Sequence, residues 1–146
     1  MINLFNIPNH IIDTSKFSSL LHDSIVNEFE QNFAKYVGAK YAVSLNSATN
    51  AIYLINRLWQ KNNEHIIPTM IPPVVCNAII ISGGHVRFKD DIKWIGDSFL
   101  LDSRKGWNVW DSAQKVERNQ FKNESVFDED LMYFSFYPTK TNAGCD

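Results

Sequence analysis

Three short stretches of this sequence have residue types that bind or react with small molecules, and each lies at the end of a predicted strand or just after it. The first stretch, residues 46–49, reads Asn-Ser-Ala-Thr and leads into a predicted helix. The unpaired backbone N–H groups and the positive dipole end of a helix start attract phosphate. Serine and threonine also cap helices that bind nothing, so a purely structural role is the alternative for Ser47 and Thr49.

The second stretch, residues 110–114, reads Trp-Asp-Ser-Ala-Gln and places a carboxylate at the end of a hydrophobic run. Asp111 in that position can pair with a buried cation, such as a protonated ring nitrogen, because an opposite charge nearby favours the ionised pair. A helix cap at a strand-to-helix junction is the alternative for Asp111.

The third stretch, residues 133–140, is rich in aromatic side chains and ends at Lys140. An amine held among apolar groups loses solvation of its charged form, so its pKa falls and it can form a Schiff base. A solvated surface lysine is the alternative. Pyridoxal phosphate (PLP) requires three contacts: a cradle for its phosphate, a carboxylate at a strand end and a lysine. The three stretches offer these contacts in that order along the chain.

The elements that must position these residues alternate between helices and strands. Helical spacing of apolar residues predicts one helix from about Ser24 to a stop at Gly38, a second after residue 49, with one face formed by residues 51, 54, 55 and 58, and a third over 74–81. Short apolar runs predict strands at residues 41–45, 65–68, 85–88, 98–101, 108–110 and 131–136. This order predicts an α/β fold with a mostly parallel sheet.

The composition excludes several classes of protein. The chain has 146 residues, of which 45% are hydrophobic and 13% aromatic, which is enough for one domain with a true core. A formal charge of -2 without blocks of like charge argues against nucleic acid as a partner, and no apolar run approaches the ~18 residues of a membrane span. Neither Cys76 nor Cys145 has a companion at metal-ligand spacing, and residues 1–12 do not resemble a signal peptide. We therefore expect a cytoplasmic protein with no metal and no membrane partner.

The three stretches, taken together, resemble the DegT/DnrJ/EryC1/StrS sugar aminotransferases, a PLP-dependent family of the aspartate aminotransferase fold type. Residues 29–43 look like the entry helix and first strand of that family, 47–51 like its Ser-Gly-Thr-x-Ala phosphate loop, 111–114 like its Asp-x-Ala-Gln signature, and 134–140 like its Schiff-base segment. The resemblance implies an N-terminal extension over 1–23 and, over 24–146, part of a three-layer PLP-binding large domain, truncated and without the small domain.

The resemblance also implies a role for each candidate residue. Lys140 would hold the cofactor aldehyde as an imine and later move the proton, and Asp111 would keep the ring nitrogen protonated. Gln114 would lie near the phenolic oxygen of the ring. The phosphate group would be bound by Ser47, Ala48 and Thr49 of the phosphate loop and by Ser135 of the Schiff-base segment.

The sequence departs from the family pattern at four places. Ala48 replaces the loop glycine, which is tolerable if this residue keeps a negative φ. Pro72 stands where many members place an aromatic ring that stacks on the cofactor. Fewer residues separate Asp91 from Asp111 than in most family members, which predicts that one strand-helix excursion is shortened or deleted. The sequence printed ends at residues 142–146, where members continue, so we expect either a fragment or a natural remnant.

Two functions follow from the resemblance. The first is a homodimeric aminotransferase that moves an amino group, from glutamate, onto a nucleotide-linked keto-sugar. The alternative is a non-catalytic module of the same fold that binds a partner chain or associates with itself. A Rossmann nucleotide-binding domain ranks last, because neither Gly-x-Gly-x-x-Gly nor a Gly-Lys-Ser/Thr loop occurs.

Overall fold

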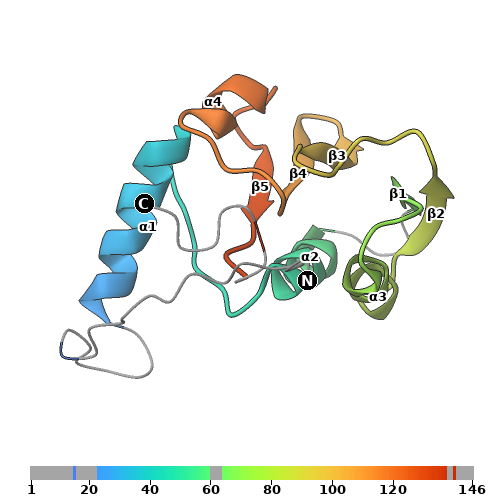
Figure 1. Cartoon of the computed structure of the whole chain (residues 1–146), viewed down its shortest axis with the longest axis horizontal. Coiled ribbons are helices and arrows are strands. Elements are labelled where there is room, and N and C mark those ends of the chain that lie inside the picture. The colour runs from blue at the N-terminus through green and yellow to red at the C-terminus, as the bar shows by residue number, and fades with distance from the viewer. Residues whose placement is uncertain (1–14, 16–22, 60–63, 138–139, 141–146) are drawn as a thin grey trace, which may run out of the picture.

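The computed structural model describes residues 15, 23–59, 64–137 and 140 of the chain. Most of the predicted extension over residues 1–23 lies outside the described residues, as do Pro138, Thr139 and the final residues 141–146. Within the described part, the elements alternate as an α/β fold (Figure 1). The predicted fold class is therefore confirmed.

Helix α1, Ser24–Val37, ends at Gly38 as predicted. Gly38 has a left-handed φ of 78°, and a Cβ at this position would lie 2.9 Å from Lys122 Cβ, so glycine is required for conformation and for space. Lys122 belongs to the short helix α4, Gln120–Glu124, and α1 therefore ends against α4 (Figure 1).

Strands β1, Glu64–Pro68, and β2, His85–Lys89, form the predicted parallel pair, with His65 opposite Val86. Helix α3, Pro73–Ile81, connects them and begins with a proline at its first position, where no N–H is needed. Gly84 lets the chain turn closely from α3 into β2, because a Cβ there would lie 2.8 Å from Ile79 Cγ2. The unit is a βαβ crossover.

Strands β3, Phe99–Arg104, and β4, Trp107–Ser112, form an antiparallel hairpin around Gly106, whereas β5, Leu131–Phe134, pairs parallel with β4. The predicted strands over 98–101 and 108–110 exist, but their mutual pairing is antiparallel and not parallel. Only a tight turn separates them, and a parallel connection needs a dozen or more residues. The hairpin is consistent with the predicted loss of one strand-helix excursion before Asp111.

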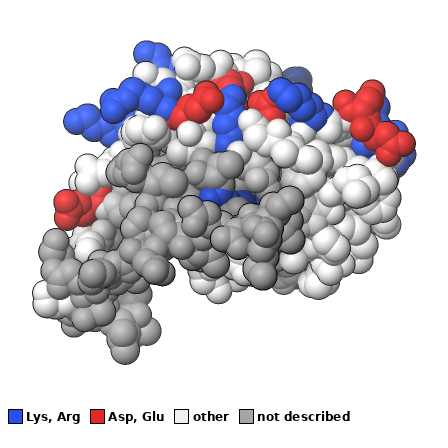
Figure 2. Space-filling view, in the orientation of Figure 1, with Lys and Arg blue, Asp and Glu red and all other residues white. Residues whose placement is uncertain are grey.

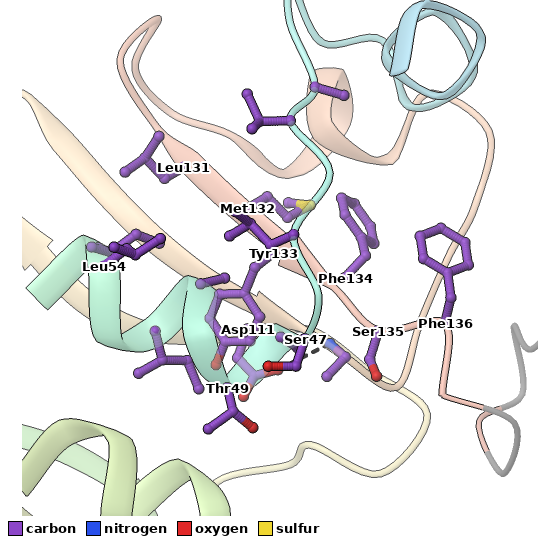
Figure 3. Close-up of a pocket in the computed structure, with 18 of the residues that line it drawn as sticks. Ser47, Thr49, Leu54, Asp111, Leu131, Met132, Tyr133, Phe134, Ser135 and Phe136 are labelled. Carbon is purple, nitrogen blue, oxygen red and sulfur yellow. Dashed lines mark hydrogen bonds between the residues drawn. The ribbon is translucent and has the colours of Figure 1, made fainter. Parts of the chain in front are cut away.

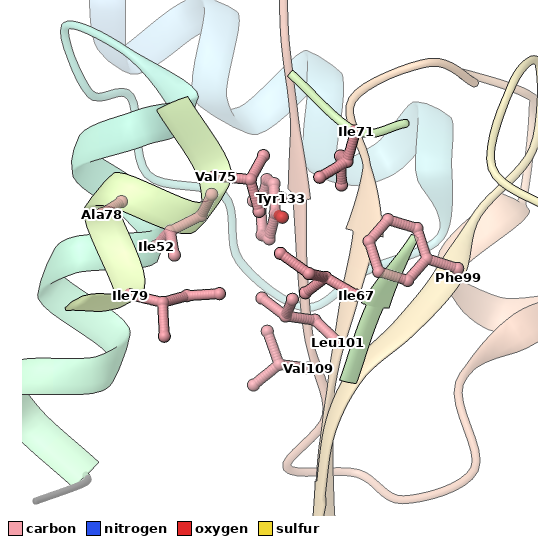
Figure 4. Close-up of a cluster of buried hydrophobic side chains, with 10 residues drawn as sticks. All are labelled: Ile52, Ile67, Ile71, Val75, Ala78, Ile79, Phe99, Leu101, Val109 and Tyr133. Carbon is pink, nitrogen blue, oxygen red and sulfur yellow. The ribbon is translucent and has the colours of Figure 1, made fainter. Parts of the chain in front are cut away.

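The hydrophobic core lies between two helices and the strands (Figure 4). Helices α2, Ala48–Trp59, and α3 cover one face, and the fully buried Ile52, Ile67 and Ile79 join helix and strand side chains across the interface. Burying apolar side chains of this size contributes about 1.5–3 kcal/mol each, so this layer contact holds the strand ends in place.

The predicted strand over residues 41–45 does not form. These residues connect α1 to α2, and Tyr41 and Val43 are 74% and 77% exposed. A strand requires a neighbouring strand edge for its backbone hydrogen bonds. The segment is instead held to α1 by the Ser44 N–H, which donates to a carboxylate oxygen of Glu30 at 2.6 Å.

Candidate cofactor site

One cavity of about 1210 Å³ opens where β4 and β5 end and α2 begins (Figure 3). In α/β sheets, ligands bind beyond the carboxyl ends of the parallel strands, and this cavity lies at such a place. All seven residues predicted for the site line it: Ser47, Ala48, Thr49, Asp111, Gln114, Ser135 and Lys140. The structure thus brings together three stretches that are far apart in the sequence.

The start of α2 forms one end of this cavity wall. Ser47 precedes the helix, its hydroxyl accepts the Asn50 N–H at 3.2 Å, and its carbonyl accepts the Ala51 N–H at 3.2 Å. The capping role that was the alternative for Ser47 is therefore real. It leaves the N–H groups of Ala48 and Thr49 without helical acceptors, since they lie in the first turn. The cap formed by Ser47 is therefore compatible with an anion-binding site at the same helix start.

Ala48 has the negative φ that an alanine needs in place of the loop glycine. Among the described residues other than glycine, Asn119 is the one with a positive φ, so Ala48 keeps an ordinary backbone conformation. The replacement of the loop glycine by alanine therefore introduces no left-handed strain at the helix start.

Asp111 ends β4 and is only 5% exposed. Burial raises the pKa of its carboxyl group, and three neighbouring groups oppose that rise: the Tyr133 hydroxyl, the Ala113 N–H and the charge of Lys140. The Ala113 N–H donates to Asp111 Oδ1 at 2.9 Å. The helix-cap alternative is wrong for Asp111, because the next helix, α4, begins only at Gln120.

Two aromatic side chains explain the burial of Asp111. In the sheet, Asp111 has Phe99 of β3 as its partner on one side and Tyr133 of β5 on the other. Both rings are buried, so they exclude water from the carboxylate without supplying a positive charge. A buried carboxylate in such surroundings fits a cationic ligand atom.

Lys140 is half-buried and lines the same cavity. Burial lowers the pKa of its amine, and the charge of Asp111 raises it. The direction of the shift and the position in the cavity favour a site residue over an ordinary solvated lysine. The backbone of Lys140 is held by its own N–H, which donates to the Tyr137 carbonyl at 2.9 Å.

An aromatic cluster positions the chain between β5 and Lys140. Phe33 of α1 contacts Phe134 and Phe136 edge to face, with ring centroids 5.0 and 5.3 Å apart, and Phe29 contacts Phe136 at 5.5 Å. Each such pair contributes about 0.5–1.5 kcal/mol beyond burial. Ser135 lies between the two clustered rings in sequence and lines the cavity (Figure 3).

Tyr133 and Trp94 are wall residues that no sequence motif indicates. The position of Tyr133 beside Asp111 follows from the β4–β5 register. Trp94, in the connection from β2 to β3, lines the cavity together with Pro72. An aromatic ring is therefore present in the wall although Pro72 replaces the aromatic residue that many family members have.

No group of three potential metal ligands occurs in the described part of the chain. None of the helices that the structure describes combines the length and apolar character needed to cross a lipid bilayer.

Comparison with known proteins identifies the family. The model of the DegT/DnrJ/EryC1/StrS aminotransferase family matches residues 7–96, which is more than half of the chain. The chain belongs to this family. The matched range includes the predicted phosphate-loop residues Ser47, Ala48 and Thr49, but it ends before Asp111 and Lys140. For Asp111 and Lys140, the structural observation is that both line the same cavity as those three residues.

Two curated relatives from Campylobacter jejuni are each named UDP-4-amino-4,6-dideoxy-N-acetyl-beta-L-altrosamine transaminase. One, from serotype O:2, is 34% identical over 92 residues, covering 58% of this chain and 24% of the relative. The other, from serotype O:23/36, is 35% identical over 66 residues, covering 44% and 18%. The chain thus spans about a quarter or less of the length of these relatives.

Two solved structures of a protein from Streptococcus pneumoniae, described as a sugar aminotransferase, share the fold. The PMP form has a TM-score of 0.52 at 25% identity, covering 67% of this chain and 26% of the other. The apo form has a TM-score of 0.61 at 17% identity and covers 93% and 48%. The described part of this family member therefore has a fold similar to part of that sugar aminotransferase.

Proposed function

We propose that this family member is the PLP-binding part of an aminotransferase that moves an amino group from glutamate to a nucleotide-linked keto-sugar. The observation that carries the proposal is the meeting of Asp111, Lys140 and the start of α2 at one cavity. Its volume exceeds the roughly 300–1,000 Å³ typical of small-molecule sites, which leaves space for cofactor and part of a substrate.

The start of α2 is the proposed phosphate end of the site. The first-turn N–H groups of Ala48 and Thr49 need acceptors, and the helix dipole favours a negative charge there. The hydroxyls of Thr49 and Ser135 add two donors at the wall of the same cavity. Ser47 takes part mainly by fixing the helix start through its cap bond to Asn50.

Asp111 and Lys140 form the proposed reactive end. Asp111 is buried, and the described group whose positive charge acts on it is Lys140. A protonated pyridine nitrogen would supply a cation paired directly with this carboxylate, so the chemistry of the residues fits the cofactor. When bound, PLP supplies an electron sink for breaking bonds at an amine carbon.

Lys140 is the proposed attachment and proton-transfer residue. Its half-buried amine has a lowered pKa, which increases the neutral, nucleophilic fraction at a given pH. The same amine, when neutral, accepts a proton and, when charged, returns it. Gln114 lines the wall beside Ala113 and is the proposed contact of the phenolic oxygen.

Absorbance and chemical trapping test this proposal. PLP added to the purified chain is expected to give a new near-ultraviolet to visible band, and borohydride should fix the cofactor on Lys140, as identified by peptide mass spectrometry. Lys140→Ala should remove the band and the label, whereas Lys105→Ala, at the exposed turn of the hairpin, should keep both. An unchanged band in Lys140→Ala would refute the assignment of this lysine.

A binding or association module of the same fold is the second candidate, and an apolar surface favours it. On the face in Figure 2, charged side chains gather over α4, the β3–β4 hairpin and β2, whereas few lie over α3. Helix α3 has no charged residue, and Val74, Ile80 and Ile81 are exposed on it. Such a surface also supports the proposed homodimer. Keto acid released from glutamate would favour the enzyme, and cofactor binding without release would favour the module.

A further inference from the structure

The side chains of Asp111 and Tyr133 lie on the same face of the sheet, next to one another. They are register partners in the parallel β4–β5 pair, and side chains of paired residues point to the same face. Figure 3 shows both at the wall of the cavity, near the start of α2. Asp111 is 5% and Tyr133 6% exposed, so both side chains are shielded from bulk water.

The Tyr133 ring is packed in the hydrophobic core, but its hydroxyl group makes no hydrogen bond within the described residues. The ring packs among Ile52, Ile71 and Val75 in the hydrophobic cluster (Figure 4). The buried hydroxyl oxygen has no hydrogen-bond partner among the residues that the structure describes. Buried polar groups normally have a partner, so an unpaired phenol beside a carboxylate requires an explanation.

The polar side chain that acts on this hydroxyl is that of its register partner, Asp111. Burial and the negative charge of Asp111 raise the pKa of Tyr133 well above its ordinary value, which keeps the phenol protonated and able to donate. The pair does not meet the geometry of a hydrogen bond, although each group alters the pKa of the other. Such contacts at reactive sites often tighten when a ligand is bound.

We propose that Tyr133 is a positioning residue of the cofactor site, whose phenol donates a hydrogen bond to the Asp111 carboxylate and holds it ionised toward the cavity. The proposal rests on the proposed function, in which Asp111 pairs with the ring nitrogen. Burial favours the protonated acid, which cannot neutralise a cation, and a donor to the carboxylate favours the charged form. Tyr133 therefore acts through Asp111 and does not itself touch the reacting atoms.

Few other groups influence this carboxylate. Besides Tyr133 and the Ala113 N–H, the charge of Lys140 acts on Asp111. Helices α2 and α3 pack against Tyr133, but α3 contains no charged side chain and the one basic residue of α2, Arg57, is in its last turn. Removing the Tyr133 hydroxyl therefore changes mainly one interaction of Asp111.

The test uses Tyr133→Phe, which keeps the ring and removes only the hydroxyl. Binding of pyridoxamine phosphate to the full chain, followed by absorbance, should weaken by about tenfold near neutral pH. Because Asp111 without its donor protonates at a higher pH, binding should also fail at a higher pH as the solution is acidified. Tyr41→Phe, an exposed tyrosine at the same cavity, should change neither property.

A second measurement needs no cofactor. The carboxyl ¹³C resonance of Asp111 should titrate at a higher pH in Tyr133→Phe than in the wild type, and the phenol ¹³C resonance of Tyr133 should follow the Asp111 titration. In Asp111→Asn the Tyr133 resonance should no longer respond over that pH range. If the wild type binds no pyridoxamine phosphate but these titrations change as stated, the proposed function fails and the Tyr133–Asp111 interaction stands. Unchanged titrations in Tyr133→Phe would overturn the inference.

Discussion

Asp130 provides the strongest stability prediction, because one buried carboxylate joins three parts of the chain. It is 4% exposed and accepts the backbone N–H groups of Asn108 at 2.6 Å and Val126 at 2.7 Å. It also accepts the indole N–H of Trp110 at 3.2 Å. The loop before β5 is thereby tied to β4, the strand that carries Asp111.

Replacing Asp130 with alanine removes the acceptor of these three donors and of the Asn108 side-chain amide, whose Nδ2 lies 3.4 Å from Asp130 Oδ2. A hydrogen bond to a charged group contributes about 1.5–3 kcal/mol, and neighbouring bonds do not add fully. We therefore expect Asp130→Ala to lower the free energy of unfolding by about 3–5 kcal/mol, and Asp130→Asn, which keeps one oxygen acceptor, by less. The exposed Asp128, changed to alanine, is the matched control.

The contribution of Asp130 to stability should also depend on pH. Burial opposes ionisation of Asp130, but the N–H donors of Val126, Trp110 and Asn108 outweigh it and lower its pKa. A folded-state pKa below the unfolded one means that the stabilisation is present above the unfolded pKa and is lost as the pH falls through the folded pKa. The stability gap between the wild type and Asp130→Asn should therefore narrow in acid.

Urea unfolding followed by tryptophan fluorescence measures both effects, at neutral pH and at a series of acidic values. The reasoning would be refuted if Asp130→Ala unfolded within about 1 kcal/mol of the wild type, or if the gap to Asp130→Asn stayed constant on acidification. Either result would mean that the three donors find other acceptors when the carboxylate is absent.

Three further outcomes are expected. Gly38→Ala should destabilise the fold by about 1–3 kcal/mol, and by more than Gly106→Ala, because both have a positive φ but only Gly38 also lacks space for a Cβ; urea unfolding compares the two. Lys140, whose pKa burial lowers, should be labelled by PLP and borohydride at a lower pH than an ordinary surface lysine, as residue-resolved mass spectrometry against pH will show. Trp94 lines the cavity, so added PLP should quench tryptophan fluorescence, and Trp94→Phe should lose a large share of that quenching.

The sequence was sufficient to predict the fold class and which residues meet at the cavity. Strand ends are legible as places where an apolar run gives way to polar residues, and parallel strands deliver these ends to one edge. This is why Asp111, near the end of β4, and Ser135, just after β5, line one cavity, whereas Ser47 reaches that cavity from the start of α2. The roles assigned to these residues remain predictions that the trapping and binding experiments test.

Pairing partners were harder to predict, because an apolar run shows which residues are hidden and not which strand lies beside them. Residues 41–45 have a strand-like pattern but no strand pairing, since pairing depends on an edge contributed from elsewhere in the chain. The hairpin did have a local signal: the Lys-Gly turn at Gly106 between two apolar runs is short enough only for antiparallel strands. The site position of Tyr133 depends on register, which no single motif reveals.

The antiparallel hairpin explains why a shortened connection before Asp111 need not disrupt the site. Strand β4 has two edges, and the hairpin occupies only the one toward β3, where the buried Phe99 faces Asp111. The other edge keeps the parallel pairing with β5 that places Tyr133 beside the same carboxylate. Because Phe99 offers no donor, Tyr133 is the polar side chain paired with Asp111 in the described sheet. An apolar residue in place of Tyr133 would leave burial as the main influence on Asp111 and shift it toward the protonated acid.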